Sequence, residues 1–476
     1  MSALAAAAIA AALGLCALTS CSLAPRYAVP SAPAAAPRYS RAGGDWKLAR
    51  PADKIPRGPW WRRFGDTRLD ALEARVASSN QDIKASFARL MQARAETRIA
   101  RAGLLPQISA TAGATRARTS INSPRFPATA APVANDFSLQ GDLSYQIDAW
   151  GRIRNSVLEA RAGEQASADD LATLELSIRA TLAIDYFTLR GEDAQIALLD
   201  GTVAEYARAL TLTRNLYRGG DAVAADVAQA RAQLESARTA AADMRLARAQ
   251  SADAIATLVG ANPTVFRIPA DPLPLGAKPP PVDPGLPSTL LERRPDIAAA
   301  ERRVAAANAA IGVARAAYFP VFDLVATVGL DSASAASWLQ ASSRMWSLGA
   351  AGALSVFDAG LHRAESAAAH ARYDELVADY RSTVIGAYQD VEDQLAALAM
   401  LARESHSESA AVAATRIAMH QAGYRYQAGI ATYLEVASTE TAALQARAAA
   451  ITIETRRLNA SVSLIEALGG GWRDSH

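Results

Sequence analysis

The chain contains the same sequence pattern twice, and this internal repeat constrains its fold more than any other feature. Two segments, Asp82-Ile83 and residues 100–106, recur 214 residues later. Four further positions recur 209 residues later with their spacing kept. We therefore expect two copies of one structural unit, at residues 66–262 and 288–470, and neither copy is expected to be an independent domain. The four positions are Tyr217, Gly220, Val227 and Gly260, which recur as Tyr426, Gly429, Val436 and Gly469.

Proline separates the regular segments of the chain, both between the copies and within them. All 22 prolines lie in residues 25–59, 106–132 and 263–295 or at Pro320. Because proline interrupts helices and central strands, the proline-free remainder is suited to long regular elements. We expect the segments outside the copies to be a signal peptide at 1–20, a lipid-anchored extended tether at 21–65, a Pro-rich linker at 263–287 and a tail at 471–476.

Each copy contains two segments in which apolar and polar residues alternate. Residues 137–148 place Phe137, Leu139 and Leu143 on one face and serine, glutamine and aspartate on the other. Such alternation predicts strands with one wet face. It fits a transmembrane sheet between lipid and a watery lumen, and it also fits an amphipathic sheet on a soluble core. The four predicted strands are 107–118, 137–148, 322–331 and 346–357.

The number of strands decides the assembly if they lie in a membrane. A sheet in lipid must close on itself because unpaired backbone groups find no water there, and single-chain barrels need about eight strands. Four strands cannot close alone. We therefore expect a ring of copies, and three copies would supply twelve strands around a lumen.

Long helices follow the strands in both copies, at residues 152–260 and 361–468. In the first copy, apolar residues recur at intervals of three and four along one stripe. Residues 152–217 would form one helix about 100 Å long, and residues 221–259 and 288–317 together have nearly the same length. The sequence predicts one long helix beside these two segments stacked end to end. A dimeric coiled coil would explain the helices but not the strands.

Charge, cysteine usage and motifs exclude several functions. The net charge is only +2, and Lys and Arg are scattered among acidic residues, so the chain has no basic stripe for nucleic acid. The only cysteines, Cys16 and Cys21, lie near the N-terminus, which excludes thiol chemistry for the rest of the chain. The sequence contains no catalytic motif, and its five histidines lack metal-ligand spacing. We expect neither an enzyme nor a metal site.

The first residues have the form of a lipoprotein signal. Residues 1–20 are almost wholly apolar and end in Leu18-Thr19-Ser20 before Cys21. We expect the mature chain to begin at Cys21 with N-palmitoyl and S-diacylglycerol groups and no other cofactor. By analogy, Ser22 favours sorting to the outer membrane. A plain signal or an uncleaved anchor helix is the alternative, because no Lys or Arg precedes Ala3.

Several motifs together closely resemble the TolC superfamily, and within it the NodT-type outer-membrane lipoproteins of resistance-nodulation-division (RND) efflux systems. The most specific is Glu-Arg-Arg-Pro-Asp-Ile at 292–297, preceded by Leu-Pro-Ser at 286–288. The resemblance extends from Cys21 to Trp472. The other motifs are Tyr-Gln-Ile-Asp-Ala-Trp-Gly-Arg at 145–152, Val-Phe-Asp-Ala-Gly at 356–360 and Ala-Leu-Gly-Gly-Gly-Trp at 467–472.

This resemblance implies a mainly α-helical, TolC-like fold with a small transmembrane β part. Four strands and very long helices per protomer would build a homotrimer, with a twelve-stranded barrel in the outer membrane and a twelve-helix tunnel in the periplasm. The resemblance implies a periplasmic membrane-fusion adaptor and an inner-membrane RND transporter as partners, and passive conduction of small toxic compounds or drugs. An exit duct for type I protein secretion or for heavy-metal efflux would share this architecture.

The resemblance also implies a gate at the periplasmic tip, formed around helix turns at Gly220 and Gly429. By motif position, Asp226 and Tyr426 match gate residues of the family, and Glu435 is the equivalent of Asp226 in the second copy. The neighbouring candidates are Tyr217, Arg218 and Arg425.

The chain departs from the family pattern at one gate position. The basic gate residue known from some relatives is replaced by Ala431, so that ion pair is absent. Rings of Asp226 and Glu435 would then favour cations at the constriction or be held by Arg218 and Arg425. The alternative is that these carboxylates only solvate a helix face.

Overall fold

The computed structural model describes residues 22–34, 58–122, 132–274, 276–282 and 290–470. The predicted signal peptide, Cys21 and the tail lie outside the described residues, as do parts of the tether and of the linker. The chain folds as two compact units. Each unit draws on both copies of the repeat, so a copy is not a domain by itself. Unit 1 takes in the segment up to Ser31 with Arg89–Ala168 and Ala299–Tyr380, and unit 2 takes in Ala32–Ala88, Asp169–Ala298 and the chain from Arg381.

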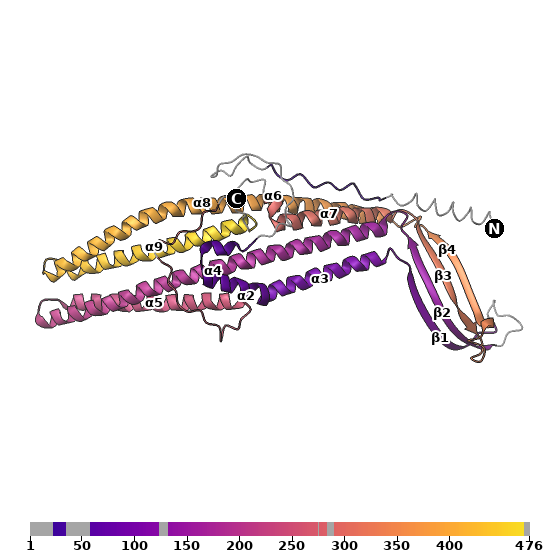
Figure 1. The fold of residues 1–476 in the computed structure, drawn as a ribbon, viewed down its shortest axis with the longest axis horizontal. Helices are drawn as coiled ribbons and strands as arrows, with labels where there is room; N and C mark the ends of the chain where they lie inside the picture. Colours follow the sequence, from indigo (N-terminus) through magenta and orange to yellow (C-terminus); the bar gives the residue numbers. More distant parts are fainter. Residues whose placement is uncertain (1–21, 35–57, 123–131, 275, 283–289, 471–476) are drawn as a thin grey trace. The chain divides into compact units, whose positions relative to one another are not determined.

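The fold is mainly helical with one small four-stranded sheet, which confirms the predicted class (Figure 1). In the described part of the chain, no helix combines the length and apolarity needed to span a bilayer. The short helix η2 (Trp60–Phe64) precedes the first copy, which comprises α2 (Thr67–Ser79), α3 (Gln81–Ala102), β1 (Gln107–Arg118), β2 (Val133–Ile147), α4 (Arg152–Gly219) and α5 (Ala224–Leu258). The second comprises α6 (Leu290–Arg293), α7 (Pro295–Ala316), β3 (Val321–Ser332), η4 (Ala341–Ser343), β4 (Arg344–Ala353), α8 (Leu361–Gln427) and α9 (Tyr433–Ala467).

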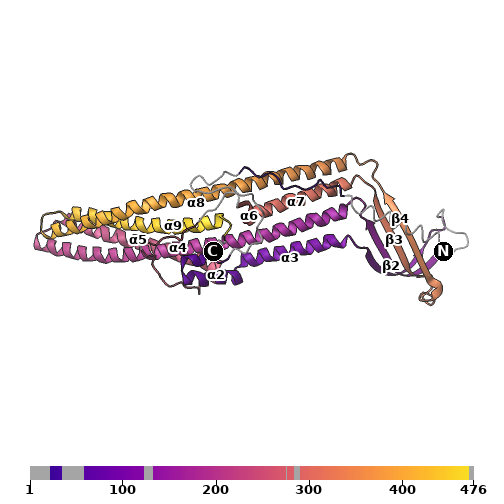
Figure 2. The same ribbon diagram turned by 45° about the horizontal axis from the view of Figure 1, so that its top comes forward.

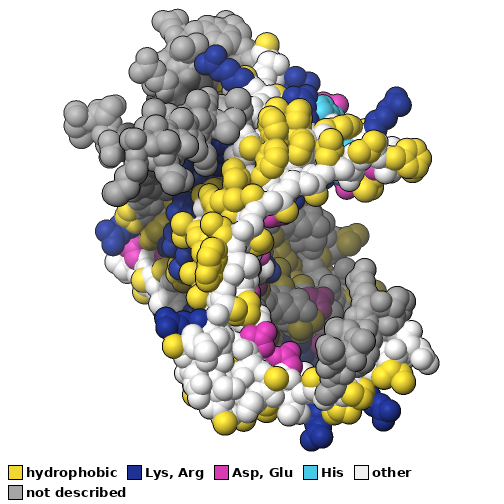
Figure 3. Space-filling view, turned by 90° about the vertical axis from the view of Figure 1, so that its right-hand side faces the viewer, with side chains coloured by type: hydrophobic (Ala, Val, Ile, Leu, Met, Phe, Trp, Pro, Cys, Tyr) yellow, Lys and Arg dark blue, Asp and Glu magenta, His cyan; other side chains and the backbone are white. Residues whose placement is uncertain are grey.

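The sheet of unit 1 is antiparallel, in the order β1-β2-β3-β4, and its register separates an apolar face from a polar face. Because side chains alternate along each strand, neighbouring rows across the sheet point to opposite faces. Figure 3 shows hydrophobic side chains gathered along one side of the strands and acidic side chains in the hollow on the other side. One apolar row is Ile108, Leu143, Ala326 and Leu348, and the next row, which is polar, is Ser109, Asp142, Thr327 and Ser347.

Two strand ends differ by four residues from the sequence-based boundaries, and the others agree within two. Strand β4 ends at Ala353, four residues before the predicted end at 357. Ala353 pairs with Val321, the first residue of β3. The residue before Val321 is Pro320, which has no backbone N–H to donate to β4, so the pairing stops there. Strand β2 begins at Val133 instead of 137 because it pairs with β1 as far as Arg118.

In unit 1, an aspartate between strand and helix begins each long helix. Asp148 accepts hydrogen bonds from two backbone N–H groups in the first turn of α4, at 2.9 and 3.0 Å. Asp358, its equivalent in the second copy, accepts hydrogen bonds from the backbone N–H groups of His362 and Gly360, at 3.0 and 2.8 Å. These backbone donors hold the pKa of Asp358 below its ordinary value. The same cap therefore starts α4 and α8 after the sheet.

Unit 2 contains two helical hairpins, α4 with α5 and α8 with α9 (Figures 1 and 2). The side-chain amide of Asn80, just before α3, donates to the carbonyl of Leu258 at the end of α5, at 2.8 Å. In the second copy, Arg294, just before α7, donates to the carbonyl of Ala467 at the end of α9, at 3.1 Å. Each copy therefore stacks its own helices, α5 on α3 and α9 on α7.

This pairing corrects one prediction. The segments at 221–259 and 288–317 were expected to stack on each other, because their combined length matches that of α4. That expectation is wrong, since the end of α5 meets α3. Helices α3 and α7 have 22 residues each, so the length match does not distinguish the two.

Glycines at the ends of α5 and α9 allow the stacked helices to approach. Gly260 and Gly469 have φ angles of +64° and +83°. A Cβ at Gly260 would lie 2.4 Å from the carbonyl oxygen of Ser79, and one at Gly469 would lie 2.8 Å from that of Arg293. Both the backbone conformation and the close approach therefore require glycine here.

Candidate functional site

The structure contains the two predicted helix turns at Gly220 and Gly429, and they share one geometry. Both glycines have positive φ angles, +90° and +74°. The N–H of Asp221 donates to the carbonyl of Leu216 at 2.9 Å, and the equivalent bond in the second turn measures 2.8 Å. This is a Schellman motif, which ends a helix with glycine in the left-handed region. In Figures 1 and 2 both turns lie at the same end of unit 2.

The predicted gate residues divide into two groups by their contacts. Arg425, near the end of α8, forms an ion pair with Glu435, in the first turn of α9, and both side chains are partly exposed. Asp226 instead accepts a hydrogen bond from the backbone N–H of Val223 at 3.3 Å and so caps its own helix. Tyr217 is half exposed at the first turn. An exposed ion pair of this kind contributes at most about 1 kcal/mol to stability.

Tyr426 belongs to an aromatic and amide network that joins the two hairpins. Its ring meets the ring of Tyr433 edge to face, with centroids 5.7 Å apart. The Tyr433 hydroxyl donates to the side-chain oxygen of Gln233 on α5 at 3.0 Å, and the Gln233 amide donates to the carbonyl of Ala437 at 3.2 Å. Burial raises the pKa of Tyr433. The network therefore ties α8 and α9 to α5 close to the turns.

Glu440 is the acidic residue that the sequence did not single out. It lies on α9 with one carboxylate oxygen buried and without a hydrogen-bond partner among the described residues. Burial raises its pKa to about 7, and the neighbouring carboxylate of Glu205 on α4 adds to the effect. One feature of the sequence sets Glu440 apart: at the corresponding position the first copy has a residue of opposite charge, Arg231.

Replacing Glu440 by glutamine should remove part of the pH dependence of stability. Folded protein keeps this proton up to about pH 7, whereas the unfolded chain releases it near the ordinary value of 4.5. The free energy of unfolding should therefore fall as pH rises from about 4.5 to about 7 and then level off. Midpoints of heat unfolding across this range should fall less steeply in Glu440→Gln. The exposed Glu235→Gln is the control and should keep the wild-type slope; the same slope in Glu440→Gln would contradict the prediction.

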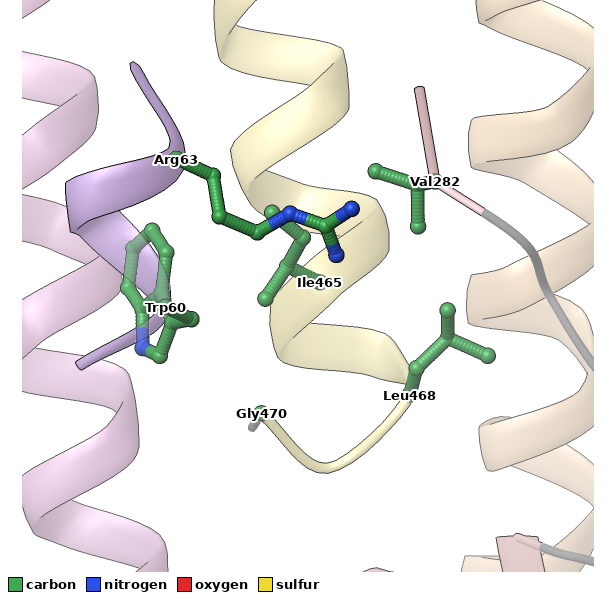
Figure 4. Close-up of a pocket in the computed structure, with 6 residues that line it drawn as sticks. All are labelled: Trp60, Arg63, Val282, Ile465, Leu468 and Gly470. Atoms are coloured by element: carbon green, nitrogen blue, oxygen red, sulfur yellow. The ribbon is translucent and has the colours of Figure 1, made fainter. Parts of the chain in front are cut away.

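A pocket in unit 2, between η2 and the end of α9, is too small for a ligand (Figure 4). Its volume is about 10 Å³, which is no more than one water molecule needs. Among the described residues, no group of three or more His, Cys, Asp or Glu side chains is placed to hold a metal ion. The pocket is lined by Trp60, Arg63, Val282, Ile465, Leu468 and Gly470.

Comparison with known proteins agrees with this geometry. The chain matches the outer membrane efflux protein family over residues 73–261 and 286–470. It is 35% identical over 426 residues to the pyoverdine export outer membrane protein OpmQ of Pseudomonas aeruginosa, covering 87% of each chain. It is 32% identical to the probable efflux pump outer membrane protein TtgC of Pseudomonas putida, covering 96% of this chain and 93% of TtgC.

Solved structures show the same fold. The outer-membrane channel OprN superposes with a TM-score of 0.86 at 28% identity, covering 95% of this chain and all of OprN. The CmeC outer membrane channel of Campylobacter jejuni superposes with a TM-score of 0.85 at 25% identity, covering 96% of both chains. These matches confirm the resemblance predicted from the sequence motifs. The chain is thus an outer-membrane efflux channel and not an enzyme, and it belongs to the outer membrane efflux protein family.

Proposed function

We propose that three copies of this chain close their sheets into one twelve-stranded barrel, which continues as a helical tunnel and serves as the exit duct of a tripartite RND efflux pump. The observation that carries this proposal is the amphipathic sheet with two edges. Within the described residues, β1 and β4 each pair on one side only. In lipid such edges need partners, and the neighbouring copies supply them.

Single-channel recording and mass measurement test the trimer together. The purified protein in detergent should have the mass of three chains and, in a planar bilayer, should conduct ions in rare, brief openings. The reason is that the polar face of the sheet lines the lumen while the tip stays closed. A monomeric protein that never conducts, at any applied voltage, would refute the duct.

Relatives indicate the kind of cargo. They are named for the export of pyoverdine and for the efflux of antibiotics and toluene, which are small organic molecules. This chain conducts small organic compounds passively from the periplasm to the exterior. Its partners are a periplasmic membrane-fusion adaptor, which docks at the tunnel, and an inner-membrane RND transporter, which supplies the energy.

The helix turns close the tunnel at rest, and the ion pair between Arg425 and Glu435 helps to hold them. Arg425→Glu should raise the probability that the channel is open severalfold, because it places like charges on neighbouring helix ends. Combining it with Glu435→Arg should restore the wild-type value in bilayer recordings. Arg403→Glu, elsewhere on the exposed surface of α8, is the control. An unchanged open probability in Arg425→Glu would rule out this role.

The lipid anchor is part of the same proposal. Acyl groups on Cys21 hold the chain in the inner leaflet of the outer membrane, in keeping with the signal motif that ends at Ser20. An N-terminal peptide from the mature protein whose mass lacks the acyl groups would contradict the anchor.

A further inference from the structure

The charged residues of the sheet in unit 1 are sorted by face. Among the described strand residues, all acidic side chains lie on the polar face and all basic side chains lie on the apolar face. The two faces of the sheet therefore carry opposite charges. The acidic residues are Asp136, Asp142, Asp323 and Asp331, and the basic residues are Arg116, Arg118 and Arg344.

The three arginines lie at one end of the sheet, away from the helices. Arg118 is the last residue of β1, and it pairs with Val133 at the start of β2. Arg344 is the first residue of β4, and it pairs with Leu330 near the end of β3. The opposite strand ends are the ones that join α3, α4, α7 and α8. There the apolar face has no charged residue among the described strand positions, so the two ends of this face differ in charge.

The three arginines are exposed, and none of them forms an ion pair with a described residue. The Nε of Arg344 donates to the carbonyl of Ala341 at 3.1 Å, which holds this side chain in place. Its terminal nitrogens have no hydrogen-bond partner in the described part of the chain. Like charges that are gathered on one face repel each other, so an anion bound among them would stabilise the group.

The height of the arginines on the sheet matches the edge of a lipid-facing band. Arg118 follows Ile108, at the helix end of β1, by ten residues, which is about 34 Å along a strand. With a strand tilt of about 40°, this length spans a height of about 25 Å, which is that of the apolar band of membrane barrels. Trp346, on the same face as Arg344 and two residues further along β4, is 78% exposed, as in the aromatic girdles that border such bands. The arginines therefore lie at the level of lipid headgroups.

We propose that Arg116 and Arg118 of one copy, together with Arg344 of the next copy, form a basic rim that binds the phosphate groups of the glycolipid in the outer leaflet. This inference rests on the proposed trimer, in which the edge strands β1 and β4 of neighbouring copies meet. Guanidinium groups bind phosphate oxygens through paired hydrogen bonds. The outer-leaflet glycolipid, lipopolysaccharide, presents phosphates where the apolar band ends. Phospholipids of the inner leaflet would meet the other end of the apolar face, which is uncharged.

Binding of lipid A, the phosphorylated part of this glycolipid, to the purified protein in detergent tests the basic rim. Mass spectrometry of the intact complex counts the bound lipid A molecules, and a titration gives the affinity. Because one arginine at a charged lipid surface contributes about fivefold to affinity, Arg118→Gln should bind lipid A about fivefold more weakly. The triple variant with Arg116→Gln and Arg344→Gln should bind about a hundredfold more weakly. Arg403→Gln, which removes one exposed charge on α8 outside the sheet, is the control and should bind as wild type.

Two further lipids identify the chemistry that the basic rim recognises. Lipid A from which the phosphate groups have been removed should bind at least about tenfold more weakly than the phosphorylated form. Phosphatidylglycerol, an anionic phospholipid, should compete only weakly for the same site. Equal binding of the two forms of lipid A, or wild-type affinity in the triple variant, would overturn the basic rim. Equal competition by phosphatidylglycerol would overturn the choice of the glycolipid as its partner.

The same preparation separates failure of the basic rim from failure of the duct. A protein with the mass of three chains that conducts ions but does not bind lipid A would overturn the basic rim alone. A monomer that never conducts would instead refute the duct on which the basic rim depends. If the triple variant does not assemble, the three single variants decide, because each keeps two of the arginines and should still lose about fivefold in affinity.

Discussion

Replacing Gly469 by alanine should destabilise the folded protein by about 3 kcal/mol or more, whereas the same change at Gly429 should cost about 1 to 2 kcal/mol. Both glycines have positive φ angles, so both variants carry the cost of a left-handed alanine. Only at Gly469 does the new Cβ also meet backbone, 2.8 Å from the carbonyl oxygen of Arg293; at Gly429 nothing lies within 4 Å.

Unfolding in guanidinium chloride, followed by the loss of helical circular dichroism, measures this difference. Gly260→Ala is the internal check, because its Cβ would lie 2.4 Å from the carbonyl oxygen of Ser79 in the equivalent contact of the first copy. The free energy of unfolding should decrease by about as much in Gly260→Ala as in Gly469→Ala. Equal losses at Gly429 and Gly469 would mean that helix stacking does not depend on this close approach.

Replacing Leu348 by arginine should block assembly in the outer membrane, and the neighbouring Ser347→Arg should be tolerated. Leu348 belongs to the apolar row and is 77% exposed in a single chain, so in the proposed barrel its side chain faces lipid. A charge on the lipid face of a barrel costs about 2 to 4 kcal/mol near the middle of the bilayer, while a lumen-facing charge stays in water.

The amount of trimer in outer-membrane fractions, detected by its resistance to dissociation in mild detergent, distinguishes the two variants. Ser347 directly precedes Leu348 in β4 and points to the polar face. The two variants therefore place the same charge at almost the same depth but on opposite faces of the sheet. If Ser347→Arg were the damaging variant, the assignment of the two faces would have to be reversed.

The sequence predicted the parts of the fold that depend on local pattern. Alternation of side chains identified the strands, and the repeat located the turns at Gly220 and Gly429, where the structure has matching Schellman motifs. The sequence did not predict which helices stack on each other. The choice between α3 and α7 as the partner of α5 is made by the contacts of Asn80 with Leu258 and of Gly260 with Ser79, and no sequence periodicity records them.

The candidate site was predicted in part for the same reason. Arg425 and Glu435 were named, and the structure places them in contact across the turn between α8 and α9. Glu440 and Gln233 were not named, because what sets them apart is burial between hairpins, a property of tertiary packing.

The pairing of β2 with β3 also sets the order in which the molecule is able to form. Ile147 pairs with Phe322, so the β1–β2 hairpin keeps an unpaired edge until the chain has continued for 175 more residues. Closing so large a loop is slow, and an exposed edge invites wrong partners meanwhile. The sheet of this chain is therefore completed only after the α4–α5 hairpin and the linker have been made, and their length sets the delay.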